Sequence, residues 1–239
     1  MNTLKRHDEQ VNKALIFTGR VGFTNAENIQ IAADRNRRGF PTQLKKMGLL
    51  LSRDMGRGRT IFGLSKAGAD RVGMPQIDIH KITWGRVDHA IIGQFETLQA
   101  IKEHGVVDYL IEPQEHAKDT RPDIIWIWCD GAKIFIEVEL SGKSISDGDL
   151  DRFFLKLLSR KTIVIFKDES LKNRYFNHAR EYIKNGIPDW QKVEGRWVKC
   201  DRLLEFEYQD WRNIYFQLHK DKGYKLGLGA IYQGVMGNY

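Results

Sequence analysis

The chain has 239 residues, which is long enough to bury a core and to form one large or two small domains. It contains 38 Lys and Arg against 31 Asp and Glu, a formal net charge of +7, and only two cysteines, Cys129 and Cys200. The spacing of these cysteines indicates neither a zinc site nor a disulfide framework. Because no apolar stretch reaches about 18 residues, we expect a cytoplasmic protein without membrane insertion.

The positive charge is unevenly distributed along the chain. Residues 1–80 carry 14 bases and 7 acids, whereas residues 81–239 carry 24 of each. A basic first third beside a neutral remainder indicates that the first part meets a polyanion, while the second folds as an ordinary globular domain. No amphipathic lysine-rich helix with a broad apolar face is present, so nucleic acid is favoured over an acidic membrane surface. We expect two domains, 1–80 and 81–239.

The first part of the chain predicts two helices before its most basic segment. Residues 3–18 place apolar side chains among charges and predict a helix that ends at Gly19. Thr24 begins a capping-box sequence, so a second helix is expected to run from there through Ala33.

A third helix, a hairpin and a fourth helix are expected next. Pro41 suits the first position of a helix that runs to Met47, with Leu44 and Met47 facing inward. Two apolar segments then flank residues 55–59, in which glycine and arginine alternate after Met55, and this pattern predicts the tip of a hairpin. Ser65 is a suitable cap for the following helix.

Three helices, a basic hairpin and a further helix are the order of a winged helix-turn-helix domain. In that fold the third helix enters the major groove and the hairpin contacts the neighbouring backbone. The candidate DNA-binding residues lie before the third helix, on its exposed face and at the hairpin tip, and they are Arg37, Arg38, Thr42, Gln43, Lys45, Lys46, Arg57 and Arg59. The alternative is a small helical bundle with a solvated basic face. Two arginines between glycines on a tight hairpin argue against it.

The second part of the chain predicts a mixed sheet. After a connector, a helix is expected over residues 88–104 and a strand over 106–111. Two apolar runs, 124–128 and 133–140, are joined by an Asp-Gly turn and predict a β-hairpin. A helix from Asp149 to Arg160 and a wholly apolar strand, 162–166, complete the order helix, strand, strand, strand, helix, strand. That order is typical of an α/β (α+β) domain whose sheet is flanked by helices.

The last part of the chain is rich in aromatic residues. A helix is expected over residues 171–185, and strands are expected around 196–200 and 203–208. Because aromatic stripes belong to the core more often than to base-stacking surfaces, we interpret the aromatic residues of 190–216 as core. The glycine-containing end, 222–239, predicts a loose tail or an edge strand.

Three acids are expected to converge on the hairpin. Glu137 and Glu139 share one face of a strand, roughly 7 Å apart, and antiparallel pairing brings Asp123 close to them. Like charges at that distance raise one another's pKa unless a cation neutralises them, and oxygen-only ligands favour Mg²⁺ or Mn²⁺. The alternative is that both glutamates lie on a solvated strand face. Their position in an otherwise apolar strand favours the metal site, since buried charges must be paired or ligated.

The motif Pro122-Asp123, followed by Glu137-x-Glu139 and then Lys143, resembles the PD-(D/E)xK nuclease superfamily, in a variant where an acid stands at the usual lysine position. Together with the winged-helix pattern, residues 1–166 resemble the replication-relaxation family and especially its MobC-type (MOBC) plasmid relaxases. The resemblance implies a divalent-metal-dependent endonuclease that nicks one strand of double-stranded plasmid DNA at a transfer origin. It also implies an accessory relaxosome protein and a conjugative coupling protein as partners.

The resemblance assigns roles residue by residue. Asp123, Glu137 and Glu139 match the metal-binding acids, and Lys143 lies near the usual lysine but not at its spacing. We take these four as the candidate catalytic residues, with Arg152 or Lys156 as further candidates for stabilising the transition state. A tyrosine nucleophile is not assigned, because the sequence contains no His-x-His motif.

Two other functions are compatible with the sequence. A DNA-binding regulator of plasmid replication or mobilisation would keep a nuclease-like domain that is inert and serves assembly. A restriction-type endonuclease would cut both strands, and it would need a dimer because one active site makes one nick.

Overall fold

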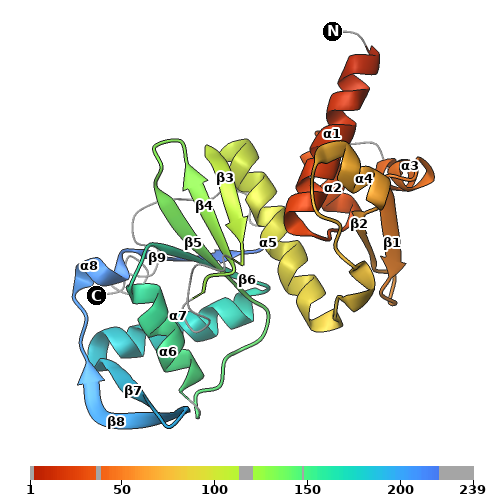
Figure 1. Cartoon of the computed structure of the whole chain (residues 1–239). Coiled ribbons are helices and arrows are strands. Elements are labelled where there is room, and N and C mark those ends of the chain that lie inside the picture. Colours follow the sequence, from red (N-terminus) through yellow and green to blue (C-terminus); the bar gives the residue numbers. More distant parts are fainter. Residues whose placement is uncertain (1–2, 36–38, 113–120, 147, 221–239) are drawn as a thin grey trace. The chain divides into compact units, whose positions relative to one another are not determined.

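The protein is described here by a computed structural model and is a mixed α/β protein (Figure 1). The residues that it describes are 3–35, 39–112, 121–146 and 148–220. The chain divides into two compact units, Met1–Glu103 and His104–Tyr239, named here the N-terminal unit and the C-terminal unit. In the described ranges, no helix is both long enough and apolar enough to cross a membrane.

The N-terminal unit contains helices and one antiparallel hairpin, in the predicted order. Its elements are α1 (Thr3–Val21), α2 (Ala26–Ala32), α3 (Phe40–Lys46), β1 (Leu50–Asp54), β2 (Thr60–Leu64), α4 (Lys66–Val72), the 3-10 helix η1 (Ile79–Lys81) and α5 (Trp84–Glu103). A single bridge between Thr24 and Phe62 places the segment between α1 and α2 against β2. The core of this unit is formed by α1, α2, α3 and the hairpin, with Leu15, Ile29 and Leu44 fully buried.

The first helix does not end at Gly19, contrary to the prediction. It continues to Val21, and the chain turns at Gly22, where φ is +79°. A Cβ atom at position 19 would lie 2.6 Å from the Cβ of Met74. Gly19 is therefore needed for close packing against the segment after α4, and this tertiary requirement outweighs the low helix propensity of glycine.

The N-cap of α4 was predicted correctly, and the N-cap of α2 was predicted wrongly. Ser65 caps α4, and its side chain accepts a hydrogen bond from the Gly68 N–H. The cap of α2 is Asn25 rather than Thr24, because the Asn25 side chain accepts from the Asn28 N–H. Ser65 and Asn25 both have an extended backbone and a short polar side chain, which is what an N-cap requires.

The ends of α3 and α5 also differ from the predictions. Met47, which we expected to face inward, is 46% exposed because the helix ends at Lys46 and Met47 is the cap residue. Helix α5 begins at Trp84 rather than Asp88. It is joined to the rest of its unit by the Gln94 side chain, whose Nε2 donates to the carbonyl of Phe23 at 2.8 Å.

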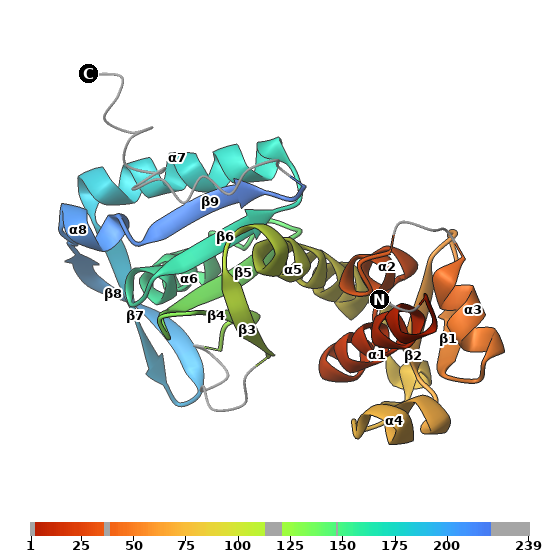
Figure 2. The ribbon, with the colours of Figure 1, turned by 90° about the horizontal axis from the view of Figure 1, so that it is seen from above.

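The C-terminal unit is built around a five-stranded sheet in the order β3-β4-β5-β6-β9 (Figure 2). Its elements are β3 (Val106–Ile111), β4 (Ile124–Trp128), β5 (Lys133–Glu139), α6 (Asp149–Leu158), β6 (Thr162–Phe166), α7 (Glu169–Asn185), β7 (Ile187–Val193), β8 (Arg196–Leu204), α8 (Tyr208–Trp211) and β9 (Ile214–Leu218). Strands β3, β4 and β5 are antiparallel neighbours, whereas β6 pairs parallel to β5 and β9 parallel to β6. Strands β7 and β8 form a separate hairpin.

One face of this sheet packs against α6 and α7 through a large apolar cluster. Phe154 and Leu157 of α6, Tyr175 of α7 and Phe166 of β6 are fully buried there. The aromatic residues of 190–216 were predicted as core, which holds for Trp211 and Phe216. It is wrong for Trp197, which is 37% exposed on the β7–β8 hairpin. Strands β7 and β9 were not predicted.

Candidate functional site

The structure brings Asp123 to the two glutamates of β5. Ile124 of β4 pairs with Ile136 of β5, and the backbone N–H of Asp123 donates to the carbonyl of Ile136 at 3.1 Å. The Oδ2 atom of Asp123 accepts a hydrogen bond from the Val138 N–H at 2.8 Å. The carboxylate is thus fixed at the start of β4, where its charge acts on Glu137 and Glu139.

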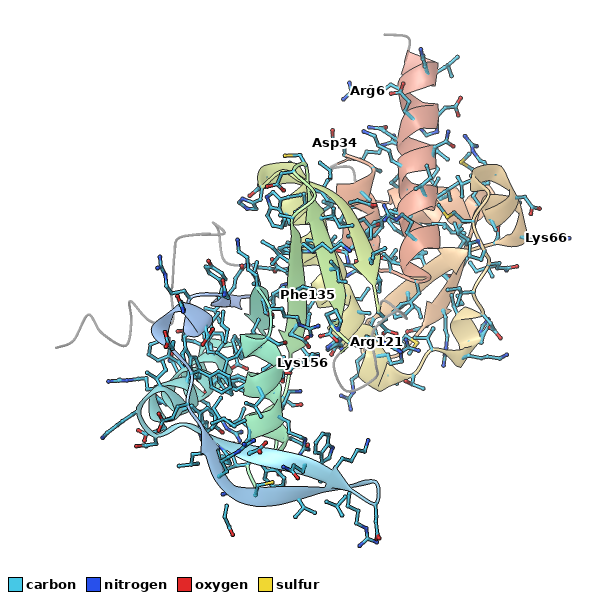
Figure 3. All side chains as sticks on the ribbon, turned by 60° about the vertical axis from the view of Figure 1, so that its left-hand side comes forward. Arg6, Asp34, Lys66, Arg121, Phe135 and Lys156 are labelled. Carbon is cyan, nitrogen blue, oxygen red and sulfur yellow. The ribbon has the colours of Figure 1, made fainter. Side chains whose placement is uncertain are left out.

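Glu137 is only 4% exposed and is held by two cations, one on α6 and one two residues after the end of that helix. The Nζ atom of Lys156 lies 2.7 Å from its Oε1 atom, and an Nη atom of Arg160 lies 3.2 Å from the same oxygen. Lys156 also donates to the backbone carbonyl of Arg121 at 2.7 Å (Figure 3). Helix α6 and the segment directly after it therefore supply the two charges that balance this buried carboxylate.

Glu139 is 6% exposed and has a different pair of partners. The Nζ atom of Lys143 lies 2.8 Å from its Oε1 atom, and the Tyr175 hydroxyl donates to Oε2 at 3.0 Å. The same hydroxyl accepts a hydrogen bond from the Lys143 N–H at 3.1 Å. Tyr175 thereby fixes both the carboxylate of Glu139 and the backbone that carries Lys143.

The electrostatics of the site follow from burial and from the close approach of the acids. Burial, followed by the charge of Asp123, raises the pKa of Glu137 to about 7, although Lys156 and Arg160 act in the opposite direction. Burial also raises the pKa of Glu139, and Lys143 opposes that shift. Glu137 therefore exchanges its proton near neutral pH, where a small change in its surroundings alters its charge.

The three carboxylates suit a hard divalent cation in their chemistry, because all their donor atoms are oxygens and a cation would relieve their mutual repulsion. Each glutamate is, however, already paired with Lys or Arg. With the side chains as they stand, no group of three or more His, Cys, Asp or Glu among the described residues is arranged to hold a metal ion. Metal binding would require Lys143 and Lys156 to turn away from the acids.

The candidate DNA-binding residues occupy the N-terminal unit. Arg37 and Arg38 lie outside the described residues. The four predicted residues of α3 are all exposed, and they are Thr42, Gln43, Lys45 and Lys46. Arg57 is exposed at the hairpin tip, where its φ of 52° places it in the left-handed region between two glycines with the same sign of φ. A non-glycine residue there is strained, and such strain often accompanies function.

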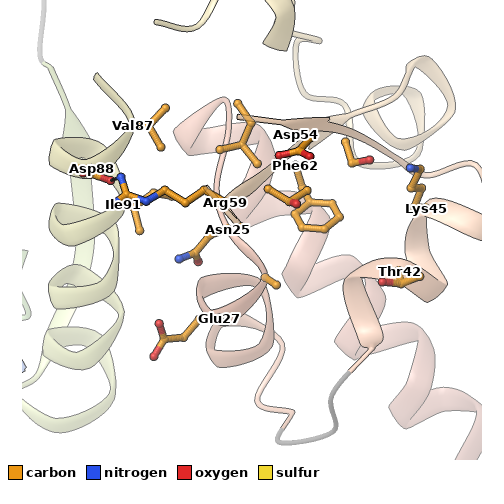
Figure 4. A pocket seen from close by; sticks show the side chains of 15 residues that line it. Asn25, Glu27, Thr42, Lys45, Asp54, Arg59, Phe62, Val87, Asp88 and Ile91 are labelled. Carbon is orange, nitrogen blue, oxygen red and sulfur yellow. Dashed lines mark hydrogen bonds and ion pairs between the residues drawn. The ribbon is translucent and has the colours of Figure 1, made fainter. Parts of the chain in front are cut away.

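Arg59 has partners within its own unit. It forms an ion pair with Asp88 of α5, and its guanidinium lies 5.3 Å from the centroid of the Trp84 ring. Thr42, Lys45 and Arg59 line a cavity of about 750 Å³, and the acids Glu27, Asp54 and Asp88 line it too (Figure 4). The charge of Arg59 is thus offset locally, whereas Arg57 forms no ion pair with the residues that the structure describes.

Three residues that contact the glutamates were not predicted to do so, namely Lys156, Arg160 and Tyr175. Their spacing of four residues places Lys156 and Arg160 on one face of the predicted helix 149–160, but the sequence did not indicate that both turn toward Glu137. Tyr175 gave no signal, because its contact with Glu139 depends on how α7 packs on the sheet. A spacing pattern identifies a helix face, but the partner of that face is set by tertiary packing.

Comparison of the chain with protein-family models, with curated proteins and with solved structures gives no significant match. The assignment to relaxases therefore remains a hypothesis that rests on the motif and on the arrangement described above.

Proposed function

We propose that this protein is a divalent-metal-dependent DNA nickase, a plasmid mobilisation relaxase that acts at a transfer origin. The observation that carries the proposal is the convergence of Asp123, Glu137 and Glu139 at one place on the sheet, surrounded by lysines. Glu137 and Glu139 are buried beside Asp123, and burying carboxylates is costly, since replacing buried ion pairs with apolar residues is often neutral or stabilising. Groups with pKa values perturbed in this way are concentrated at functional sites.

The strand order supports a PD-(D/E)xK core for the C-terminal unit. Three antiparallel strands, β3 to β5, are followed by α6 and by β6, which is parallel to β5. The acids stand just before β4 and at the end of β5, as the motif requires. In the N-terminal unit, the helix order and the Thr24–Phe62 bridge against the hairpin support the winged-helix assignment.

Asp123, Glu137 and Glu139 are the residues that would hold Mg²⁺ or Mn²⁺. Such a metal, when bound, supplies a water of lowered pKa and neutralises charge on the phosphate. In this proposal Lys156 and Lys143 leave the carboxylates and bind the phosphate oxygens of the substrate, where their charge stabilises the transition state. Tyr175 keeps Glu139 oriented as a neutral hydrogen-bond donor, since burial raises its pKa.

The N-terminal unit would select the DNA site. The exposed polar residues of α3 are suited to base edges, and Arg57 at the hairpin tip is suited to the backbone. Because the two units are parts of one chain, DNA bound by the first is present at high effective concentration for the second. An accessory relaxosome protein and a coupling protein are the partners that this function implies.

The test is a nicking assay on supercoiled plasmid that carries the cognate origin, with and without Mn²⁺. We expect metal-dependent conversion to open circles, loss of that conversion in Asp123→Ala and Glu137→Ala, and nearly unchanged binding to the origin. Glu169→Gln is the matched control, because Glu169 is an exposed acid of α7 whose ion pair with Lys172 lies on the surface. Nicking that persists in both active-site variants would refute the assignment.

A second candidate is a DNA-binding regulator with an inert nuclease-like unit. The observation in its favour is the complete pairing of Glu137 and Glu139 with cations of the chain. A regulator would give the same footprint with and without Mg²⁺ and no open circles. Linear product in the plasmid assay would instead indicate a restriction-type endonuclease that acts as a dimer.

A further inference from the structure

The C-terminal unit contains a cavity of about 760 Å³ between α6 and the β7–β8 hairpin. Three cations line it, Lys143, Arg152 and Lys156, together with the rings of Trp190 and Trp197. Lys143 and Lys156 are the residues that pair with Glu139 and Glu137. The cavity is therefore adjacent to the acid cluster, and its size lies in the range of pockets that bind small organic groups.

One face of the hairpin alternates aromatic and basic side chains. Trp190 pairs with Lys199 and Lys192 with Trp197, so these four residues share a face of the two-stranded ribbon. The Nζ atom of Lys192 lies 5.6 Å from the centroid of the Trp197 ring. The opposite face carries Arg196 at the corresponding end of β8, so the chain itself supplies a control position.

Arg152 of α6 links this face to the cavity. Its guanidinium carbon lies 4.7 Å from the centroid of the Trp197 ring and 5.3 Å from that of Trp190. Arg152 also forms an ion pair with Asp149. Trp197 remains 37% exposed, so part of its ring is accessible beside a planar cation.

Trp190 is fixed to α6 by a buried polar contact. Its Nε1 atom donates to Oδ2 of Asp151 at 2.8 Å, and Asp151 is 6% exposed and also accepts from the Tyr182 hydroxyl. A Cβ atom at Gly148 would lie 2.1 Å from the Trp190 ring, so the ring lies directly on the backbone before α6. The Trp190 ring of the cavity wall is thus held in place before any ligand binds, which lowers the entropic cost of binding.

We propose that this cavity binds one unpaired nucleotide of a DNA strand, with its base stacked on Trp197 and its phosphate held by Arg152 and Lys143. Aromatic rings beside backbone-binding cations are the general means by which proteins bind single strands. A paired base in duplex DNA has both faces covered by its neighbours and cannot stack on the ring. The inference deepens the proposed nickase function and rests on it in one respect, because the bound strand continues to the acid cluster through Lys143 and Lys156.

The test is fluorescence anisotropy with the full chain, a labelled single-stranded oligonucleotide and its duplex, in EDTA so that no nicking occurs. Trp197→Ala should weaken single-strand binding about tenfold or more, the effect expected for loss of one stacked base, and leave duplex binding unchanged. Trp197→Phe, which keeps an aromatic ring, should stay within about threefold of the native chain. Arg196→Ala, on the opposite face, should bind both DNAs as the native chain does.

Two results would overturn the proposal: equal single-strand affinity for Trp197→Ala and the native chain, or an equal loss of single-strand and duplex binding. The Trp197→Phe variant controls for misfolding. If Trp197→Ala alone loses single-strand binding, while Trp197→Phe keeps it and duplex binding is retained, loss of the ring is the cause. The outcome is separate from that of the nicking assay. A chain that binds single strands through Trp197 but never nicks a plasmid would refute the nickase and retain the nucleotide site.

Discussion

The two units handle charge in opposite ways. In the N-terminal unit, the basic residues of α3 and Arg57 stand on the surface. In the C-terminal unit, Glu137 and Glu139 are buried and matched by lysine and arginine from within the fold. Surface charge costs little and remains available to a partner, whereas buried charge must be balanced internally until a ligand replaces the balancing group. The first arrangement suits recognition and the second suits chemistry.

The largest effect is expected at Glu139, where a substitution should impair the chemistry and leave DNA recognition unchanged. Glu139→Gln keeps an acceptor for the Tyr175 hydroxyl but removes the charge that a metal needs. We expect metal-dependent nicking to fall by at least about 100-fold, more than changes in outer-shell groups cause, with duplex binding unchanged. Plasmid conversion and a gel-shift assay measure the two quantities. Equal losses of nicking and duplex binding would show that recognition and chemistry are not separated between the two units.

The next effect concerns the balance of buried charge. Lys156→Met removes the nearer cation of Glu137 and should lower the free energy of unfolding by about 2 kcal/mol, since the buried carboxylate loses a charged partner and keeps Arg160. Lys172→Met is the control, because its ion pair with Glu169 is exposed and should contribute less than about 1 kcal/mol. Urea denaturation of both variants measures the difference. Similar losses would contradict the distinction between buried and surface pairs.

The pKa of Glu137 predicts how stability depends on pH without divalent ions. Its pKa is about 7 in the folded chain and about 4.5 when exposed, so between these values the folded state retains a proton that the unfolded state has lost. The contribution of Glu137 to stability should therefore be full below pH 4.5 and decline as pH rises through 7, by at most about 1.4 kcal/mol per pH unit. Thermal unfolding at several pH values, compared with Glu137→Gln, measures this slope. If Glu137→Gln retains the slope of stability against pH, the slope arises from another titratable group.

The smallest effect tests the exposed charge of the N-terminal unit. Arg57→Asn removes one cation and keeps a residue that tolerates a left-handed backbone, so stability should not fall. The slope of log affinity for duplex DNA against log salt concentration should decrease by about one, as expected for one lost phosphate contact. Arg59→Asn should change the slope less, because Asp88 already offsets that charge. The reverse order would mean that DNA displaces the Arg59–Asp88 pair.

Local sequence signals predicted much of the fold. The strands 106–111 and 162–166 were predicted with their observed bounds, because each is a short apolar run between clear breaks. The proximity of Asp123 to Glu137 was also predicted, since hairpin pairing follows from the turn between the strands. These features depend on residues that are near one another in the sequence.

Features that depend on distant residues were missed. The cations that pair with Glu137 come from α6 and from Arg160 just after it, and their approach is decided by how that helix packs on the sheet. Gly19 suggested a helix end, yet the packing of Met74 determines its role. Trp197 was interpreted as core because aromatic composition does not reveal that β7 and β8 form a hairpin outside the sheet.

The pairing of β9 with β6 has a consequence for how the chain matures. All five residues of β6 are buried, and β9 covers its outer edge only when residues 214–218 are present. During synthesis, a nascent chain that has not reached this segment presents an apolar strand with open hydrogen-bonding groups, a template for unwanted association. We expect truncations before Ile214 to accumulate as aggregates, because this unit closes only after residues 214–218 have been synthesised.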